Sequence, residues 1–358
     1  MDEQTQLSKK HYYLILAAVA VIGTAAALLH RPSAPLTASE VEGQERTFPC
    51  MSTIAQVKFY GRPDLTEKAE DLAQNVFQMV EKTCSTFSPE SELYKLNQSA
   101  HEKPFKCSEM LWQVLVKARE AWRLSDGAFD PTVRPLMELW GFYRKRSEVP
   151  PQGEIDEALK RVGFDKVIFD DENHTVRFKV KGIGIDLGGV AKGYAVDMAA
   201  ENVRKLGITA GVINLGGNIY CFPTPPPKKQ FYTVSVRNPL DKDKICGVIR
   251  LLNQSVATSG NYERYVTLNG RHYTHIVNPK TGLPVENMLS VTVLTRNATD
   301  ADMFSTAVFV GGPELAEKLY RTFDGLEFLI LIRSREDPDS FDIIKYGDAW
   351  GSINHAGI

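Results

Sequence analysis

The stretch IDLGGVAKGYAVD, from Ile185 to Asp197, decides the fold and the chemistry that we expect of this chain. An apolar run ends in the carboxylate of Asp186, two glycines follow, and a helix begins with Lys192 in its first turns. Glycines let the backbone approach a ligand closely, and a helix N-terminus presents free N–H groups to an anion. We therefore expect a strand, a turn and a helix that together hold a phosphate and its counter-ion.

A second segment, ATDADMFSTA from Ala298 to Ala307, predicts a helix that carries a cation site. Thr299 is expected as the N-cap, and Gly311-Gly312 is expected to end the helix. Asp302 and Thr306 are four residues apart, so their side chains share one helix face. Mg²⁺ takes oxygen ligands of this kind. In a purely structural interpretation the carboxylate complements the helix dipole and the hydroxyl bonds to a carbonyl; the glycine-rich motif favours the metal.

The periodicity predicts an α+β fold in which mixed and antiparallel sheets are flanked by helices. A hairpin turn is expected at Asn269-Gly270. Helices are expected over residues 64–83 and 108–124, with Asp64 and Ser108 as their N-caps, over 152–162, and after Asp186 as far as Leu206. Strands are expected over 54–60, 167–169, 176–180, 211–214, 231–237, 248–252, 265–268, 272–277 and 290–294.

The N-terminus differs from the rest of the chain. Lys9-Lys10 precede an uncharged, largely apolar run of 18 residues, Tyr12 to Leu29, which lies at the lower limit for crossing a bilayer. We expect a signal-anchor over residues 1–30, a linker over 31–43 and the main domain over 44–358. The basic residues before the span predict that the N-terminus stays inside and the main domain is exported. Ala25-Ala26-Ala27 leave a cleaved signal peptide as the alternative.

Charge and cysteine content narrow the class of partner. Lys and Arg number 42 against 44 Asp and Glu, so the chain has no overall field that attracts nucleic acid, and nucleic acid is not expected as a partner. The five cysteines form no C-x-x-C pair. One or two disulfides are compatible with export, and five small buried thiols are an equally good interpretation.

Six motifs occur in an order and spacing that resemble the ApbE family, the FAD:protein FMN transferases. They are DGAFDPTV (126–133), IDLGGVAKGYAVD (185–197), VINLGGNI (212–219), TSGNY (258–262), HIVNPKTGLP (275–284) and ADMFSTA (301–307). The resemblance extends from about Met51 to Ala307 and on towards Leu331. It implies an ApbE-like fold with the FAD and Mg²⁺ site in a central cleft. It also implies that FMN from FAD is joined by a phosphoester bond to a threonine or serine of a target protein, with release of AMP.

The resemblance also implies which residues form the site. The carbonyl of Gly189, Asp302 and Thr306 would hold Mg²⁺. The family contacts FAD at the positions of Met51, Phe87, Ala128, Phe129, Asp130, Asp186, His275 and Ile276, and the residue types add Lys192 and Ser259 as groups that could face the nucleotide. A place in the core is an almost equally good interpretation of Met51 and Phe87.

His275 is the best candidate for proton transfer, and Asp302 is the second residue to which we assign a catalytic role. An imidazole with an ordinary pKa of ~6.5 can act as a base on a threonine hydroxyl. The chain departs from many relatives at Asn278, where they carry aspartate, so a carboxylate that orients His275 or the metal is not present at this position.

Three functions are compatible with the sequence. The first is an FMN transferase that acts outside the bacterial inner membrane on a membrane redox subunit or a flavin carrier. The second is an FAD pyrophosphatase, which gives FMN and AMP with water as the acceptor and uses the same site. The third is an exported flavin-binding protein without activity, and the presence of Asp186, His275, Asp302 and Thr306 argues against it.

Overall fold

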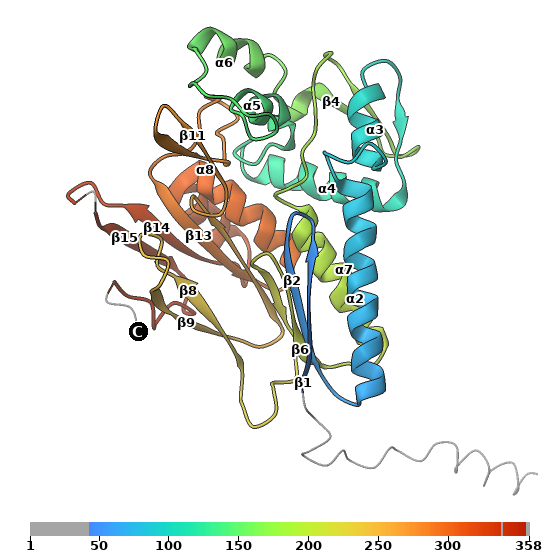
Figure 1. Cartoon of the computed structure of the whole chain (residues 1–358), viewed down its shortest axis with the longest axis vertical. Helices are drawn as coiled ribbons and strands as arrows, with labels where there is room; N and C mark the ends of the chain where they lie inside the picture. The colour runs from blue at the N-terminus through green and yellow to red at the C-terminus, as the bar shows by residue number, and fades with distance from the viewer. Residues whose placement is uncertain (1–42, 338, 356–358) are drawn as a thin grey trace, which may run out of the picture. The chain divides into compact units, whose positions relative to one another are not determined.

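Eight strands form a central sheet within residues 43–337 and 339–355, which are the residues that this computed structural model describes (Figure 1). The order of the strands is β1-β2-β6-β7-β10-β13-β14-β15, and every neighbouring pair is antiparallel. The strands are β1 (Gly43–Cys50), β2 (Thr53–Tyr60), β6 (Ala210–Leu215), β7 (Asn218–Cys221), β10 (Gln254–Gly260), β13 (Met288–Thr295), β14 (Glu327–Arg333) and β15 (Phe341–Tyr346).

Three helices cover one face of this sheet. They are α2 (Pro63–Cys84), α7 (Ala191–Lys205) and α8 (Ala298–Thr322), which contact β1 and β2, β6 and β7, and β10 and β13, respectively. The other face is covered by the hairpin of β8 (Tyr232–Arg237) and β9 (Ile245–Leu251), whose apolar side chains pack in one cluster with residues of β13 and β14. Because both faces are covered, all eight residues of β13 are buried, including Ser290, Thr292 and Thr295.

Smaller elements complete the chain at one end of the sheet, where Figure 1 shows α5, α6 and β11. An apolar cluster built on Leu136, Trp140 and Ile155 packs α5 and α6 against the β11–β12 hairpin. The remaining elements are α3 (Glu92–Ser99), β3 (Phe105–Lys106), α4 (Glu109–Leu124), α5 (Arg134–Leu139), α6 (Gln152–Leu159), β4 (Val167–Asp170), β5 (Thr175–Phe178), β11 (Tyr265–Leu268), β12 (Arg271–Thr274) and the 3-10 turns Pro131–Val133 and Phe164–Lys166.

The antiparallel register brings distant motifs to one end of the sheet. Leu215 at the end of β6 pairs with Asn218 at the start of β7 and with Ala55 near the start of β2. Gly260 at the end of β10 pairs with Ser290 near the start of β13. The first turn of α7 lies at this end as well, because α7 packs on β6 and leads back into it. We call this region the site end of the sheet.

Most elements expected from periodicity are confirmed. Ser108 caps α4 by accepting from the N–H of Leu111, α7 ends just before Gly207 in a left-handed conformation, and Asn269-Gly270 joins β11 to β12. Antiparallel pairing dominates, as predicted. The sequence reasoning missed the strands β1, β3, β7, β10, β14 and β15 and the helices α3 and α5.

Three local predictions were wrong. Residues 183–187 before the Gly188-Gly189 turn form no strand. They are held instead by a side chain, since Asn97 donates to the carbonyl of Ile185 (2.8 Å) and accepts from its N–H (2.7 Å). The N-cap of α8 is Asn297, which accepts from the N–H of Asp300, and not Thr299. Asp64 does not cap α2, whose N-cap position is Arg62.

The first helical segment of α8 ends at the predicted glycines, and a second segment follows it. Gly312 has a non-helical conformation (φ 77°, ψ −172°), and the second segment begins at Pro313 and runs to Thr322. At its start, Asp197 of α7 accepts from the N–H groups of Ala298 (2.7 Å) and Thr299 (2.8 Å). This carboxylate satisfies donors that the helix itself leaves free.

The predicted signal-anchor and nearly all of the linker lie outside the described residues. Within residues 43–337 and 339–355, no helix combines the length and apolar character needed to cross a membrane. All five cysteines are buried and unpaired, which agrees with the interpretation as small buried thiols.

Candidate active site

Asp302 is the anionic centre of the site and lies between α7 and α8. It is only 4% exposed. Its Oδ2 accepts from the main-chain N–H of Gly193 (3.0 Å), and the ammonium of Lys192 lies 3.2 Å from its Oδ1. Lys192 also donates to the carbonyl of Gly188 (2.6 Å). A buried carboxylate is stable only with such partners, so the first turn of α7 and its preceding glycine turn are built around Asp302.

Close helix packing makes this arrangement specific. A Cβ atom on Gly193 would lie 2.2 Å from the carbonyl oxygen of Ala298 and 2.8 Å from the Cβ of Asp302. A side chain at this position would therefore separate α7 from α8. The glycine in the KGYAVD segment is required by the crossing of the two helices.

Neutral oxygen atoms lie beside this carboxylate. The Oγ of Ser259, at the end of β10, lies 3.3 Å from the Oγ1 of Thr306 and 2.9 Å from the Oγ of Ser305. A Cβ on Gly189 would lie 3.2 Å from the Oγ1 of Thr306 and 3.1 Å from the ring of Phe129. The structure therefore brings together four residues that the sequence predicted separately: Gly189, Ser259, Thr306 and Phe129.

The donor set suits a hard cation. It consists of one carboxylate, hydroxyl groups and main-chain carbonyls, all of which are oxygen donors of the kind that Mg²⁺ prefers. Across the part of the chain that the structure describes, no three His, Cys, Asp or Glu side chains gather in one place, so a softer, ligand-rich metal centre has no counterpart there. The ammonium of Lys192 already places a positive charge between Asp302 and the carbonyl of Gly188. The residues thus fit a cation at this position.

A second group of side chains surrounds Asp186. Its Oδ1 accepts from the N–H of Gly188 (2.7 Å), and its Oδ2 accepts from the phenol of Tyr143. Burial, followed by the charge of Asp186 and this hydrogen bond, raises the pKa of Tyr143 well above its ordinary value, so the phenol stays protonated and donates. The ring of Phe87 packs edge-on against Tyr143 (5.1 Å between centroids) and is 50% exposed. An exposed aromatic face beside a carboxylate suits a planar heterocycle.

Sequence reasoning missed Tyr143 and two arginines of this group. The guanidinium of Arg134 lies 5.7 Å from the ring centre of Tyr143, and that of Arg264 lies 6.0 Å from the ring centre of Phe87. No short-range pattern predicts these contacts, because Arg134, Tyr143 and Arg264 come from separate parts of the chain. Two cations beside the aromatic pair suit an anionic ligand.

His275 is held in one tautomer by the base of the β11–β12 hairpin. Its Nδ1 lies 3.0 Å from the main-chain carbonyl oxygen of Arg264, and its main-chain N–H donates to the same oxygen (3.1 Å). A carbonyl only accepts, so Nδ1 carries the proton and Nε2 has a free lone pair. Burial lowers the pKa of His275 to about 4, and the positive charges of Arg264 and Lys192 also lower it. The imidazole is therefore neutral near pH 7 and can accept a proton.

The turn after His275 explains why asparagine can replace the aspartate of many relatives at position 278. The side-chain oxygen of Asn278 accepts from the N–H groups of Lys280 (2.9 Å) and Thr281 (3.3 Å). Asparagine and aspartate supply this acceptor equally well. Gly282 follows with φ 73°, and its carbonyl accepts from the indole N–H of Trp140 (2.8 Å). The residue at position 278 therefore shapes the turn.

The other residues that the resemblance assigns to FAD lie in different surroundings. Asp130 is buried, and its two oxygens accept from Thr132 and from the N–H of Phe164 (3.0 Å), so this carboxylate holds two loops together. Ala128 and Ile276 are buried in the apolar core. Met51 lies in the β1–β2 turn with φ 51°, at the site end of the sheet, and its N–H donates to Glu81.

The fold and the site together suit a protein that binds an anionic ligand with a planar ring, together with a cation. Comparison with known proteins narrows this class. The model of the ApbE family matches residues 51–330. A relative from Haemophilus influenzae, a FAD:protein FMN transferase, is 32% identical over 283 residues, which are 75% of this chain and 82% of the relative. Another of that name, from Klebsiella pneumoniae, is 30% identical over 284 residues, 78% of this chain and 84% of the relative.

Solved structures agree with the sequence matches. The ApbE protein of Thermotoga maritima superimposes with a TM-score of 0.77 at 30% identity, covering 85% of this chain and 97% of its own. The flavin transferase ApbE of Vibrio cholerae superimposes with a TM-score of 0.76 at 25% identity, covering 86% and 98%. This chain belongs to the ApbE family.

Proposed function

We propose that this chain transfers FMN from FAD to a threonine or serine of a target protein and releases AMP. The family and the names of the relatives support this activity. The single observation that carries the proposal is the meeting of Asp302, Thr306 and Ser259 with the Gly188-Gly189 turn at the first turn of α7. Such a site suits a pyrophosphate and its counter-ion.

The acceptor hydroxyl would be activated by His275. Nδ1 is occupied by the carbonyl of Arg264, so the free Nε2 takes the hydroxyl proton. The acceptor oxygen forms a bond to the phosphorus of the FMN half, the bond between that phosphorus and the bridging oxygen breaks, and AMP departs with that oxygen. Positioning and charge stabilisation supply most of the rate in reactions of this type.

The cation that we propose for the site is Mg²⁺, held by Asp302, Thr306 and the carbonyl of Gly189. When bound, it would neutralise negative charge on the pyrophosphate. Lys192 would then exchange its contact with Asp302 for one with a phosphate oxygen. Phe87 and Tyr143 would contact a planar ring of FAD, which would lie in a cleft between the site end of the sheet and the β11–β12 hairpin.

We further propose that residues 1–30 anchor the chain in the bacterial inner membrane with the catalytic domain outside the cytoplasm. The basic pair Lys9-Lys10 before an apolar run of 18 residues supports this orientation. An acceptor on that side of the membrane, in a redox complex subunit or a flavin carrier, would then be within reach.

The test uses the full chain in detergent with FAD, Mg²⁺ and a membrane fraction of the source organism. Proteins that receive FMN fluoresce in a denaturing gel, and mass spectrometry of the labelled peptide identifies the acceptor. Labelling that requires Mg²⁺ and is lost with EDTA and in Asp302→Asn supports the proposal. Formation of free FMN and AMP with no labelled protein would instead assign the chain as an FAD pyrophosphatase, and intact FAD would leave it a binding protein.

A further inference from the structure

Asn218, the first residue of β7, carries a buried side-chain oxygen without a hydrogen-bond partner. The residue is 3% exposed, and its Oδ1 is one of three buried side-chain oxygens that have no partner within residues 43–337 and 339–355. Buried polar atoms in folded proteins are nearly always hydrogen-bonded, because an unmet acceptor costs stability. This oxygen therefore needs a partner that the chain itself does not supply.

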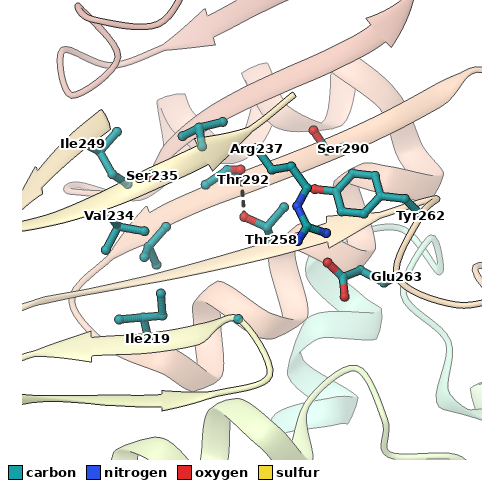
Figure 2. Close-up of a pocket in the computed structure, with 13 residues that line it drawn as sticks. Ile219, Val234, Ser235, Arg237, Ile249, Thr258, Tyr262, Glu263, Ser290 and Thr292 are labelled. Carbon is teal, nitrogen blue, oxygen red and sulfur yellow. Dashed lines mark hydrogen bonds between the residues drawn. The ribbon is translucent and has the colours of Figure 1, made fainter. Parts of the chain in front are cut away.

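The strand pattern places the side chain of Asn218 on the face of the sheet that carries the candidate active site. Ile219 and Thr258 line a pocket of about 140 Å³ between the β8–β9 hairpin and the sheet (Figure 2). Successive side chains of a strand point to opposite faces, so Asn218 and Ser259 lie on the other face. That face is covered by α7 and α8, which both contact β7. Leu215, the cross-strand neighbour of Asn218, packs in the same apolar cluster as residues of these two helices.

The strand register brings Asn218 close to Ser259. The pair Val256–Ile219 sets the alignment of β10 with β7. One residue along each strand from this pair, Asn218 lies beside Ala257, and Ser259 is its diagonal neighbour on the same face. The Cα atoms of diagonal neighbours are roughly 7–8 Å apart. The amide of Asn218 and the hydroxyl of Ser259 are therefore near enough to contact one bound ion and its water shell.

The polar groups around Ser259 are already hydrogen-bonded to one another. Its Oγ lies 2.9 Å from that of Ser305 and 3.3 Å from the Oγ1 of Thr306. Ser305 in turn donates to the carbonyl of Asp302 (2.9 Å). None of these contacts involves Asn218. Since Asp302 and Thr306 are the side chains that would hold the cation, Asn218 borders the proposed cation site without a protein partner for its Oδ1.

The chemistry of the unpartnered atom selects among the possible ligands. A side-chain amide oxygen only accepts, so a phosphate oxygen, which also accepts, is not its partner. Mg²⁺ dehydrates reluctantly and usually keeps several water molecules, which donate hydrogen bonds. Groups that hold the surroundings of a bound metal contribute roughly ten- to hundredfold to its affinity. A water molecule in the shell of the cation is the partner that fits this oxygen.

We propose that Asn218 is a positioning residue of the cation site, where its amide oxygen accepts a hydrogen bond from a water molecule bound to Mg²⁺. This inference rests on the proposed function, because the cation is part of it. The turn before Asn218 fixes the position of the amide. Gly216 (φ 57°) and Gly217 (φ 89°) form a two-residue hairpin turn, and Asn214 accepts from the N–H of Gly217 (3.0 Å). The motif VINLGGNI thereby gains a role in the site.

The first test is isothermal titration of the full chain in detergent with Mg²⁺ alone, without FAD. Asn218→Leu keeps the approximate size of the side chain and removes the amide, so it should raise the Kd for Mg²⁺ about tenfold or more. Asn218→Asp keeps an acceptor oxygen at the same place and should bind Mg²⁺ at least as tightly as the wild type.

Ser255→Ala is the matched control for this titration. The Oγ of Ser255 is also buried without a partner, and it lies on the same face of β10 as Ser259 but at the other end of the strand. Its removal should leave the Kd for Mg²⁺ unchanged. A general effect of removing an unmet buried oxygen would appear in both variants.

Melting temperatures separate the positioning role from a structural one. Asn218→Leu and Ser255→Ala each remove an oxygen without a partner, so neither should lower the melting temperature measured without Mg²⁺. Added Mg²⁺ stabilises the folded chain only as far as it binds. It should therefore raise the melting temperature of the wild type and of Asn218→Asp more than that of Asn218→Leu.

The outcomes separate this inference from the proposed function. A wild-type Kd for Mg²⁺ in Asn218→Leu overturns the inference, as does an Asn218→Asp chain whose Kd rises as much. A lower melting temperature of Asn218→Leu without Mg²⁺ assigns the residue to the core and also overturns it. A wild-type chain that labels an acceptor but binds no Mg²⁺ overturns the cation site and keeps the transferase. A wild-type chain that binds Mg²⁺ through Asn218 but labels no protein refutes the transferase and keeps the cation site.

Discussion

The imidazole of His275 and the main-chain carbonyl of Arg264 form a hydrogen bond of 3.0 Å that leaves Nε2 as the only basic nitrogen of the ring. Arg264 directly precedes β11 and His275 directly follows β12, so the pairing of these two strands brings the Arg264 carbonyl to the imidazole. The pairing therefore sets the tautomer of His275. This bond does not depend on a carboxylate, which agrees with the structural role of Asn278. A base of this kind needs no partner acid to be ready at neutral pH.

The first prediction concerns the pH dependence of transfer. Because burial lowers the pKa of His275 to about 4, kcat/KM should be level between about pH 5.5 and 8. His275→Gln should lower kcat by about 10²- to 10⁴-fold and leave the Kd for FAD nearly unchanged. Initial rates of acceptor labelling measure both. An inflection near the ordinary histidine pKa of ~6.5 would show that the ring is not held in the neutral form.

The second prediction concerns stability. The folded pKa of His275 lies below the unfolded value, so between them the unfolded chain binds more protons than the native one. The contribution of this residue is fully present above pH ~6.5 and is lost as the pH falls towards about 4. Urea unfolding at pH 7 and pH 5 should therefore show a smaller pH-dependent loss of stability in His275→Gln than in the wild type. Equal losses would contradict the prediction.

The third prediction tests the crossing of α7 and α8. Gly193→Ala places a Cβ 2.2 Å from the carbonyl oxygen of Ala298 and should lower the free energy of unfolding by about 1–3 kcal/mol. It should also weaken Mg²⁺-dependent activity, because Asp302 moves with the helix. Gly153→Ala is the matched control: no atom lies within 4 Å of its added Cβ, and a helical alanine should be neutral or stabilise by about 0.5–1 kcal/mol. Thermal unfolding measures the stability of both variants, and equal stability of Gly193→Ala and Gly153→Ala would contradict the prediction.

The fourth prediction concerns the cation. The ammonium of Lys192, 3.2 Å from Asp302, competes with a metal for the carboxylate when FAD is not bound. Lys192→Gln should therefore tighten Mg²⁺ binding to the FAD-free chain roughly twofold to fivefold, as expected for a partly exposed ion pair, and should raise the KM for FAD. Isothermal titration measures the first effect. Lys205→Gln makes the same charge change at the far end of α7 and should alter neither quantity.

The fifth prediction concerns the exposed aromatic ring. Phe87 is 50% exposed, so Phe87→Ala should change the melting temperature little. Loss of ring contact should raise the Kd for FAD roughly twofold to tenfold, the range expected for one aromatic pair. Tyr320→Ala removes another exposed ring, 40% exposed, on α8 and serves as the control. If the two variants have equal Kd values for FAD, Phe87 does not contact FAD.

Local signals in the sequence were enough to predict the helices and hairpins. Apolar periodicity located α4 and α7, and Asn269-Gly270 located the β11–β12 turn, because these depend on residues close in the chain. Strands β14 and β15 were missed because sheet pairing joins segments far apart in sequence. The strand predicted before Asp186 was wrong for a related reason, since the amide of Asn97, 88 residues away, takes the place of a neighbouring strand.

The candidate site was predictable in its residue types and not in its surroundings. The spacing of Asp302 and Thr306 on one helix face was visible, and the structure places both beside the glycine turn. The contacts of Tyr143 and Arg264 were not visible, because they follow from loop packing that no short-range pattern encodes. Asp130 matched a family position, yet its carboxylate is engaged with Thr132 and Phe164.

The cap that Asp197 places on the start of α8 has a consequence for the exchange of segments between relatives. Its carboxylate joins α7 to the start of α8 through two hydrogen bonds, and Gly193 approaches Ala298 closely at the same place. Residues 185–197 and 298–307 thus form a single interlocking part, although about a hundred residues separate them in the chain. A chimera that replaces one of them with the corresponding segment of a distant relative should fail, whereas one that replaces both together should assemble a working site.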